Sequence, residues 1–194
     1  MLNSLKIKKI KKGFTLVEML IVVAAFSILI TAVIGVFVSS IRTQRYTLAS
    51  QELLNQTSYA VEYMSRLVRM AKKDINADCL ATPTDNFEET TMGDDDGLKF
   101  LSYHEEGRCL EFFLDNGQVK ERRTIIGIGT EDLPLTSENL EVTSLKFYVS
   151  GESQSDNYQP RITIVLKARV KNLEESPEIE LQTSVSQRNL DIAF

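Results

Sequence analysis

KKGFTLVE, residues 11–18, joins a basic leader to the apolar segment MLIVVAAFSILITAVIGVFV at residues 19–38. The apolar segment carries no charge, and at about 1.5 Å per residue it would extend roughly 30 Å as a helix, the thickness of a bilayer core. The sequence therefore predicts a membrane-spanning helix. Five lysines in the leader hold the N-terminus in the cytoplasm, so everything after about Ser39 is expected on the exported side.

A secretory signal peptide is the alternative interpretation of this segment. The apolar region of a signal peptide stops after about 7–15 residues at a cleavage site of small residues. Here the apolar run continues past Ala24 and Ala25 into Phe26 and Ile28. This continuation favours the spanning helix.

Glu18 is the unusual residue of the segment, because it places a carboxylate at the start of the apolar run. A carboxylate in a bilayer core costs about 3 kcal/mol even on lenient insertion scales, so such a residue is interpreted as functional, with a partner to be named. The alternative is that Glu18 lies near the membrane edge and reaches water.

The junction resembles the cleavage and methylation site of type IV pilins and pseudopilins over about 25 residues. In that family a prepilin peptidase cuts after the glycine, here Gly13, and N-methylates the new first residue, here Phe14. The resemblance implies that Glu18 pairs with the N-terminal amine of a neighbouring subunit. At ~4 Å and an effective dielectric of ~20 this attraction is about 4 kcal/mol before desolvation, and methylation leaves the amine cationic.

The helix is expected to continue beyond the membrane, from about Phe14 to Lys73. Residues 42–73 contain neither Pro nor Gly, and apolar or small residues recur there at steps of four and three, which is the spacing of one helix face. That face needs a cover, and a sheet is the expected one. The residues of the face are Leu53, Thr57, Ala60, Met64, Leu67 and Ala71.

After Asp74 the pattern changes to loops and short strands. Residues 77–97 are expected to form a long irregular loop, and Asn116-Gly117 predicts a tight hairpin. Alternating apolar and polar residues predict strands with one buried face, most clearly in the last two candidates. The strand candidates are residues 98–103, 109–114, 118–126, 142–149, 161–170 and 178–186.

The predicted fold class is α+β and pilin-like, with one long N-terminal helix whose outer half packs on an antiparallel β-sheet. The expected organisation is a cleaved leader at 1–13, a transmembrane and assembly half of the helix at 14–40, an exported amphipathic half at 41–75 and a globular sheet domain at 76–194. Within this last domain, residues 181–189 resemble the closing strand of J-type minor pseudopilins and the related W-type minor pilins.

Two cysteines, Cys79 and Cys109, lie on the exported side, where an oxidising compartment permits a disulfide. The alternative is two unpaired cysteines in a core. No cofactor is expected; the alternative to a solvated acidic turn is Ca²⁺ held by Asp94, Asp95 and Asp96, although the ligand spacing of an EF-hand is absent.

No enzyme is expected, because the sequence lacks a phosphate-binding Gly-rich loop, HExxH, G-x-S-x-G and a metal-spaced Cys/His cluster. Cleavage after Gly13 would change the formal net charge from −5 to −10, because the leader carries five lysines and no acid. Such an acidic surface argues against direct contact with nucleic acid.

The sequence and the resemblance together predict a structural subunit, and a minor one, of a type IV pilus or a type II secretion pseudopilus. Its expected partners are other pilins or pseudopilins, prepilin peptidase, the inner-membrane assembly platform and the membrane itself. The precursor is expected in the cytoplasmic membrane with one span, its N-terminus inside and its globular domain in the periplasm or outside the cell, and in a filament after assembly. The alternatives are a monomeric anchored binding module and an anchored hydrolase. The sequence leaves secretion, pilus and competence systems undistinguished.

Overall fold

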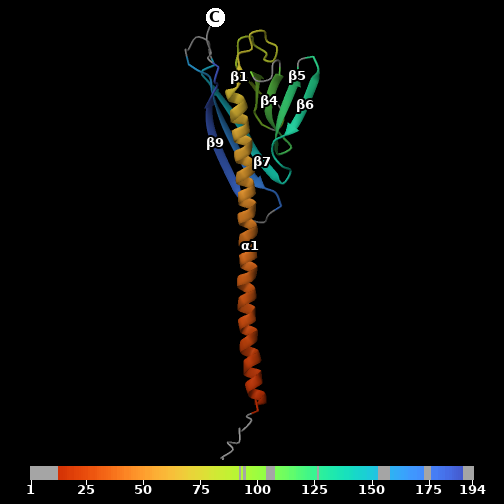
Figure 1. The fold of residues 1–194 in the computed structure, drawn as a ribbon, viewed down its shortest axis with the longest axis vertical. Helices are drawn as coiled ribbons and strands as arrows, with labels where there is room; N and C mark the ends of the chain where they lie inside the picture. The colour runs from red at the N-terminus through yellow and green to blue at the C-terminus, as the bar shows by residue number, and fades with distance from the viewer. Residues whose placement is uncertain are drawn as a thin grey trace, which may run out of the picture. The chain divides into compact units, whose positions relative to one another are not determined.

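A computed structural model describes residues 13–91, 93, 95–103, 108–125, 127–152, 158–172 and 176–189 (Figure 1). The chain divides into two compact units, residues 1–45 and 46–194. Helix α1, Leu16–Arg69, contributes residues to both units. Residues 1–12 of the basic leader lie outside the described part of the chain.

The second unit contains two antiparallel sheets. In the first sheet the strand order is β1-β3-β4-β5-β6, with β2 also paired to β3; in the second sheet the order is β7-β8-β9. The strands are β1 (Ala71–Lys72), β2 (Phe87–Thr90), β3 (Gly97–Ser102), β4 (Arg108–Asp115), β5 (Gln118–Ile125), β6 (Gly129–Pro134), β7 (Leu140–Ser150), β8 (Arg161–Val170) and β9 (Glu178–Ser186). One long helix followed by antiparallel sheets is the α+β, pilin-like arrangement that the sequence predicts.

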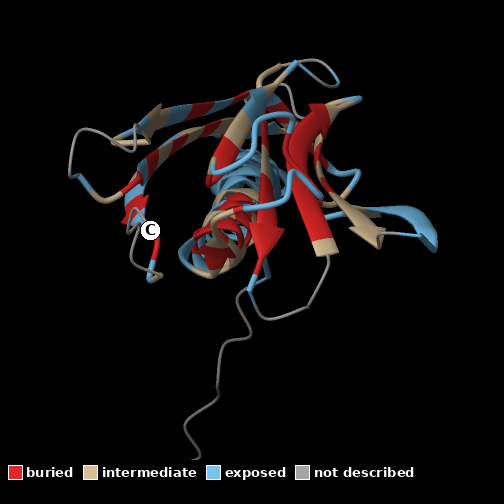
Figure 2. Ribbon diagram, turned by 90° about the horizontal axis from the view of Figure 1, so that it is seen from above, coloured by how far each residue is buried: buried red, intermediate tan, exposed pale blue. Residues whose placement is uncertain are grey.

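One hydrophobic core joins the C-terminal part of α1 to both sheets. Figure 2 shows buried segments of both sheets gathered around the helix. Leu53, Thr57, Ala60 and Met64, four members of the predicted helix face, are buried, whereas Leu67 packs against the core only partly buried. The aromatic rings of Phe87, Phe100 and Phe112 pack in series, with neighbouring centroids 6.0 and 5.8 Å apart.

Strand positions agree well with the sequence pattern in three places. β8 and β9 have the predicted bounds. The Asn116-Gly117 hairpin is confirmed, because both residues have positive φ (52° and 71°) and connect Asp115 to its cross-strand partner Gln118. Positive φ at both central residues is the geometry that an Asn-Gly turn suits.

Two predicted boundaries are wrong. The helix ends at Arg69 rather than near Lys73, because Ala71 and Lys72 pair with β3 and Tyr103 donates its backbone N–H to the carbonyl of Met70. The predicted irregular loop at 77–97 contains β2, whose Phe87 is 2% exposed and anchors the strand in the core.

A buried carboxylate ties α1 to β5. Glu121, only 1% exposed, accepts a hydrogen bond from the Tyr63 hydroxyl at 2.9 Å and pairs with the Arg123 guanidinium at 3.0 Å. Arg123 also donates to the Tyr63 hydroxyl at 2.9 Å. Burial and the hydrogen bond to Glu121 raise the pKa of Tyr63. The three side chains satisfy one another, which offsets the cost of burying the Glu121 charge.

Asp74 organises the turn that follows β1. Its carboxylate accepts hydrogen bonds from the backbone N–H groups of Asp78 (3.0 Å), Cys79 (2.7 Å) and Leu80 (2.8 Å). Burial of Asp74 opposes its ionisation, but these N–H groups outweigh that effect and hold the pKa of the carboxyl below its usual value. The ionised side chain therefore stabilises the turn.

Asp74→Asn should weaken the pH dependence of stability in acid. Because the folded-state pKa of Asp74 is depressed, its stabilisation is fully present above its unfolded-state pKa of about 3.9 and is lost as pH falls through the lower folded-state value. Thermal unfolding of the full chain in detergent, followed by circular dichroism from pH 7 to pH 2, should show a flatter curve for Asp74→Asn than for the wild type. Asp78→Asn, which changes an exposed carboxylate four residues away, is the control. If the curves of Asp74→Asn and the wild type ran parallel, the ionised Asp74 carboxylate would not stabilise the fold as stated.

Candidate processing and assembly site

The predicted scissile bond, between Gly13 and Phe14, lies outside the helix. Residues 13–15 have no regular secondary structure, and α1 begins at Leu16. Phe14 is 75% exposed, and a side chain added at Gly13 would meet no atom within 4 Å. The Gly13–Phe14 peptide bond therefore precedes the helix and lies between exposed residues.

Thr15 caps the N-terminus of α1. Its side-chain oxygen accepts a hydrogen bond from the Glu18 backbone N–H at 3.2 Å, and its carbonyl accepts one from Met19 at 3.2 Å. This is N-cap geometry, in which a hydroxyl satisfies a backbone N–H that the helix itself leaves unpaired. The helix therefore starts on residues that would remain after cleavage at Gly13.

The capping residue was missed in the sequence, although a signal for it was present. Thr15-Leu16-Val17-Glu18 has the S/T-x-x-E pattern of a capping box. Glu18 lies in the first turn of α1, where the positive end of the helix dipole favours a carboxylate. The first turn of α1 is thus a favourable position for an acidic residue, in addition to the role that the pilin resemblance implies for Glu18.

The N-terminal part of α1 offers an uncovered apolar surface. Every residue from 13 to 40 is exposed in the isolated chain. Among the described residues α1 is the helix whose length and composition suit it to cross a membrane. Ser27 and Thr31 donate their hydroxyls to carbonyls one turn earlier, at 2.8 Å each, so this surface presents no unsatisfied hydroxyl group from these two residues.

Cys79 and Cys109 are brought together as a disulfide, with their Cα atoms 5.4 Å apart. The bond joins the Asp74 turn to β4. Its neighbours Leu80 and Leu101 complete a small apolar cluster beside the main core. The disulfide therefore lies within the globular unit, far in sequence from the processing segment.

Of the three candidate calcium ligands, Asp95 has a structural role. The Asp95 carboxylate accepts hydrogen bonds from the Ser144 hydroxyl at 3.0 Å and the Leu145 backbone N–H at 2.9 Å, and its other oxygen accepts the Asp96 backbone N–H at 3.1 Å. Asp94 lies outside the described residues. In the part of the chain that the structure describes, no three His, Cys, Asp or Glu side chains are grouped so that they could hold a metal ion.

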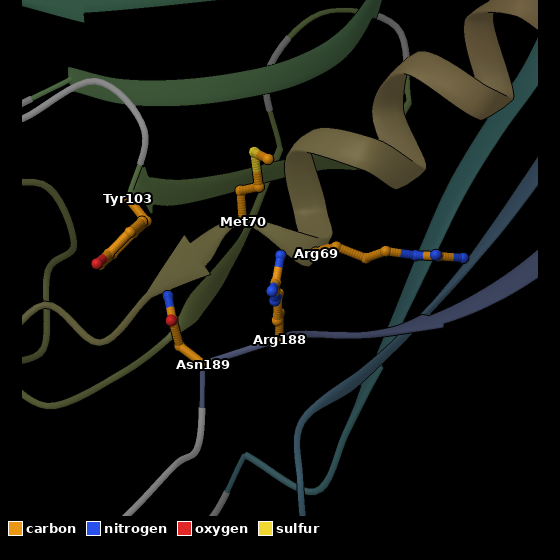
Figure 3. Close-up of a pocket in the computed structure, with 5 residues that line it drawn as sticks. All are labelled: Arg69, Met70, Tyr103, Arg188 and Asn189. Carbon is orange, nitrogen blue, oxygen red and sulfur yellow. The ribbon is translucent and has the colours of Figure 1, made fainter.

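A cavity of about 340 Å³ lies where α1 ends, lined by Arg69, Met70, Tyr103, Arg188 and Asn189. Figure 3 shows the Arg69 side chain extending away from the other four residues. Asn189 donates its amide to the Ala71 carbonyl at 3.0 Å. The guanidinium groups of Arg69 and Arg188 point to different places, so they do not form a joint anion site.

The family model described as the prokaryotic N-terminal methylation motif matches residues 8–34. Comparison with curated proteins found no match, and comparison with solved structures found none either. The motif and the fold support a type IV pilin-like protein and a substrate of prepilin peptidase. The apolar helix fits a membrane-anchored protein, the motif implies assembly with other pilins, and a pilin-type fold suggests a structural protein rather than an enzyme.

Thr15→Val should loosen the start of α1. Removing the capping oxygen costs about 1 kcal/mol, which corresponds to roughly fivefold faster hydrogen exchange if exchange follows local opening. Amide exchange at residues 16–18 of the processed chain in detergent micelles measures this. Thr15→Ser keeps the oxygen and should restore wild-type exchange; equal exchange in Thr15→Val and the wild type would rule out the cap.

Proposed function

We propose that this protein is a minor subunit of a type IV pilus or type II secretion pseudopilus. The precursor sits in the cytoplasmic membrane with its N-terminus inside and its globular unit outside. Prepilin peptidase cuts after Gly13 and methylates Phe14. At the assembly platform, the apolar helix then packs against the helices of other subunits. The observation that carries the proposal is the methylation motif at 8–34, which leads into an apolar helix surface that no described residue covers.

The role of Glu18 follows from its place in the first turn of an apolar helix. In a filament core the Glu18 carboxylate would pair with the methylated amine of Phe14 of a neighbouring subunit. The pairing neutralises two charges that are costly to bury alone and fixes the axial register between helices. The minor role is supported by the resemblance of residues 181–189 to the closing strand of J-type pseudopilins and W-type pilins.

Gly13→Val tests the processing step. A side chain at Gly13 meets no atom within 4 Å, so the variant should keep the described fold and lose only recognition by the peptidase. With a co-expressed prepilin peptidase, the wild type should become thirteen residues shorter, while Gly13→Val remains full length. Gly35→Ala, at the other open glycine of α1, should be processed normally. A shortened Gly13→Val chain, or a wild type that is never shortened, would contradict the proposal.

Glu18→Ala tests the assembly step separately. The variant should be processed as the wild type is, but its incorporation into filaments should fall at least about tenfold, because the neighbour's buried amine loses its counter-charge. Glu18→Asp retains the charge and should recover part of the incorporation. The measurement is the amount of this chain in sheared filaments relative to the membrane fraction. Normal incorporation of Glu18→Ala would instead support a tethered module that uses α1 only as an anchor.

A further inference from the structure

The outer edge of β9 carries unpaired backbone groups. The Gln187 N–H donates to the Pro160 carbonyl, and the Val170 N–H at the end of β8 donates to the Pro177 carbonyl. With the register of β8 and β9, these bonds show that the odd-numbered residues of β9 direct their backbone N–H and C=O groups toward β8. Because the N–H and C=O groups of successive residues point to opposite sides of a strand, the even-numbered residues from 178 to 186 direct theirs away from β8. Within the described residues, no hydrogen bond joins these outward groups to another segment.

The opposite edge of the same sheet is closed by the protein itself. The outward N–H of Val142 donates to the Gly117 carbonyl at 2.8 Å. Further along β7, Leu145 donates to the Asp95 carboxylate at 2.9 Å, and Val149 donates to the Glu89 carboxylate at 3.2 Å. Proteins generally protect exposed strand edges from pairing with other chains. This sheet is protected at β7 and open at β9.

A groove runs between this open edge and α1. Its volume is about 330 Å³, and its lining includes Val61 and Ser65 of α1 and Leu181 and Thr183 of β9. Among the residues of β9 that face the core, only Val185 is buried, whereas Leu181 and Thr183 remain half-buried. The apolar face of β9 is therefore covered incompletely on this side.

Ser65 contributes a buried hydroxyl with no partner to the groove. The residue is 9% exposed, and its Oγ makes no hydrogen bond. Five other hydroxyl side chains of α1 instead donate to a carbonyl one turn earlier. Those residues are Ser27, Thr31, Thr43, Ser50 and Thr57. Buried polar atoms are nearly always hydrogen-bonded, so the unpaired Ser65 Oγ indicates a missing partner.

Charges of opposite sign lie toward the two ends of β9. Arg69, whose carbonyl accepts the Arg188 N–H just beyond β9, lines the groove, and within the described residues its guanidinium makes no hydrogen bond or ion pair. Glu178 and Glu180 lie at the start of β9, on its exposed face and outside the groove, where both pair with Lys167, at 3.6 and 3.9 Å. A segment that matches these charges carries an acidic residue on its groove side, near Arg69, and basic residues on its other side, near Glu178 and Glu180.

We propose that β9 binds an extended segment of another protein, which adds antiparallel to it as a fourth strand. The segment's main chain pairs with the outward groups of residues 178 to 186, and its apolar residues, at alternate positions, enter the groove over Val61 and Leu181. Its acidic residue meets Arg69, and a carbonyl or hydroxyl accepts the Ser65 hydroxyl. Strand addition of this kind draws affinity from backbone hydrogen bonds and specificity from alternate side chains. The proposal stands whether or not the protein enters a filament.

The blocked peptide TDTVTVKVK is a probe built to these requirements. Its aspartate would lie near Arg69 and its lysines opposite Glu180 and Glu178, while its valines face the groove. Fluorescence anisotropy with the full chain in detergent should show saturable binding, and hydrogen exchange should slow across β9. The charge-exchanged peptide TKTVTVDVD should bind at least about tenfold more weakly.

Gln182→Pro separates edge pairing from other modes of binding. Proline removes one outward N–H without touching the hydrogen bonds to β8, and edge strands tolerate it. Binding of the probe should weaken at least about tenfold, whereas Ser184→Ala, which keeps the backbone N–H, should bind as the wild type does. If Gln182→Pro does not fold, Arg69→Glu decides, because it should weaken the binding of TDTVTVKVK and narrow the difference between the two peptides.

Three outcomes would overturn the proposal. The first is no saturable binding of either peptide by the wild type. The second is binding that neither Gln182→Pro nor Arg69→Glu alters. The third is association of the wild-type chain with itself that Gln182→Pro abolishes in size-exclusion chromatography, because β9 would then serve a second copy.

Discussion

The removal of the N-terminal apolar helix from water is the constraint on which the proposed processing and assembly of this protein depend. Seventeen large apolar side chains between residues 14 and 38 are exposed in the isolated chain. Each would gain about 1.5–3 kcal/mol on burial, so the surface represents tens of kcal/mol, more than the roughly 5–15 kcal/mol net stability of a domain. Only a membrane or other apolar helices can supply that burial. The proposed cleavage site and the proposed counter-charge both lie at the start of this surface, within the six residues from Gly13 to Glu18.

The globular unit is stabilised independently of that surface. Its core, the Glu121 pair, the Asp74 turn and the Cys79–Cys109 disulfide all lie beyond residue 45. Several carboxylates in this unit accept hydrogen bonds from backbone N–H groups that have no partner in the sheets or turns. The unit can therefore keep its structure while the apolar helix changes surroundings, and its open β9 edge remains available to another chain.

The sequence was sufficient for the features that depend on local patterns. Alternation located β8 and β9, Asn116-Gly117 located a hairpin, and the four-and-three spacing located the buried face of α1. Features that depend on distant partners were missed. β2 contains one apolar residue, Phe87, and β6 is mostly exposed, so neither shows alternation. The predicted end of α1 was too late because Ala71 and Lys72 are good helix formers, yet they pair with β3 as a short strand. The cap at Thr15 was readable from its pattern and was overlooked.

Processing at Gly13 is tested by tandem mass spectrometry of the N-terminal peptide of the chain, isolated from the membranes of cells that contain a prepilin peptidase. The expected peptide begins at Phe14 and carries one added methyl group on its terminal amine, followed by unmodified Thr15 to Glu18. A chain that begins at Met1, or one cut within the apolar segment as a signal peptide would be, would contradict processing at Gly13.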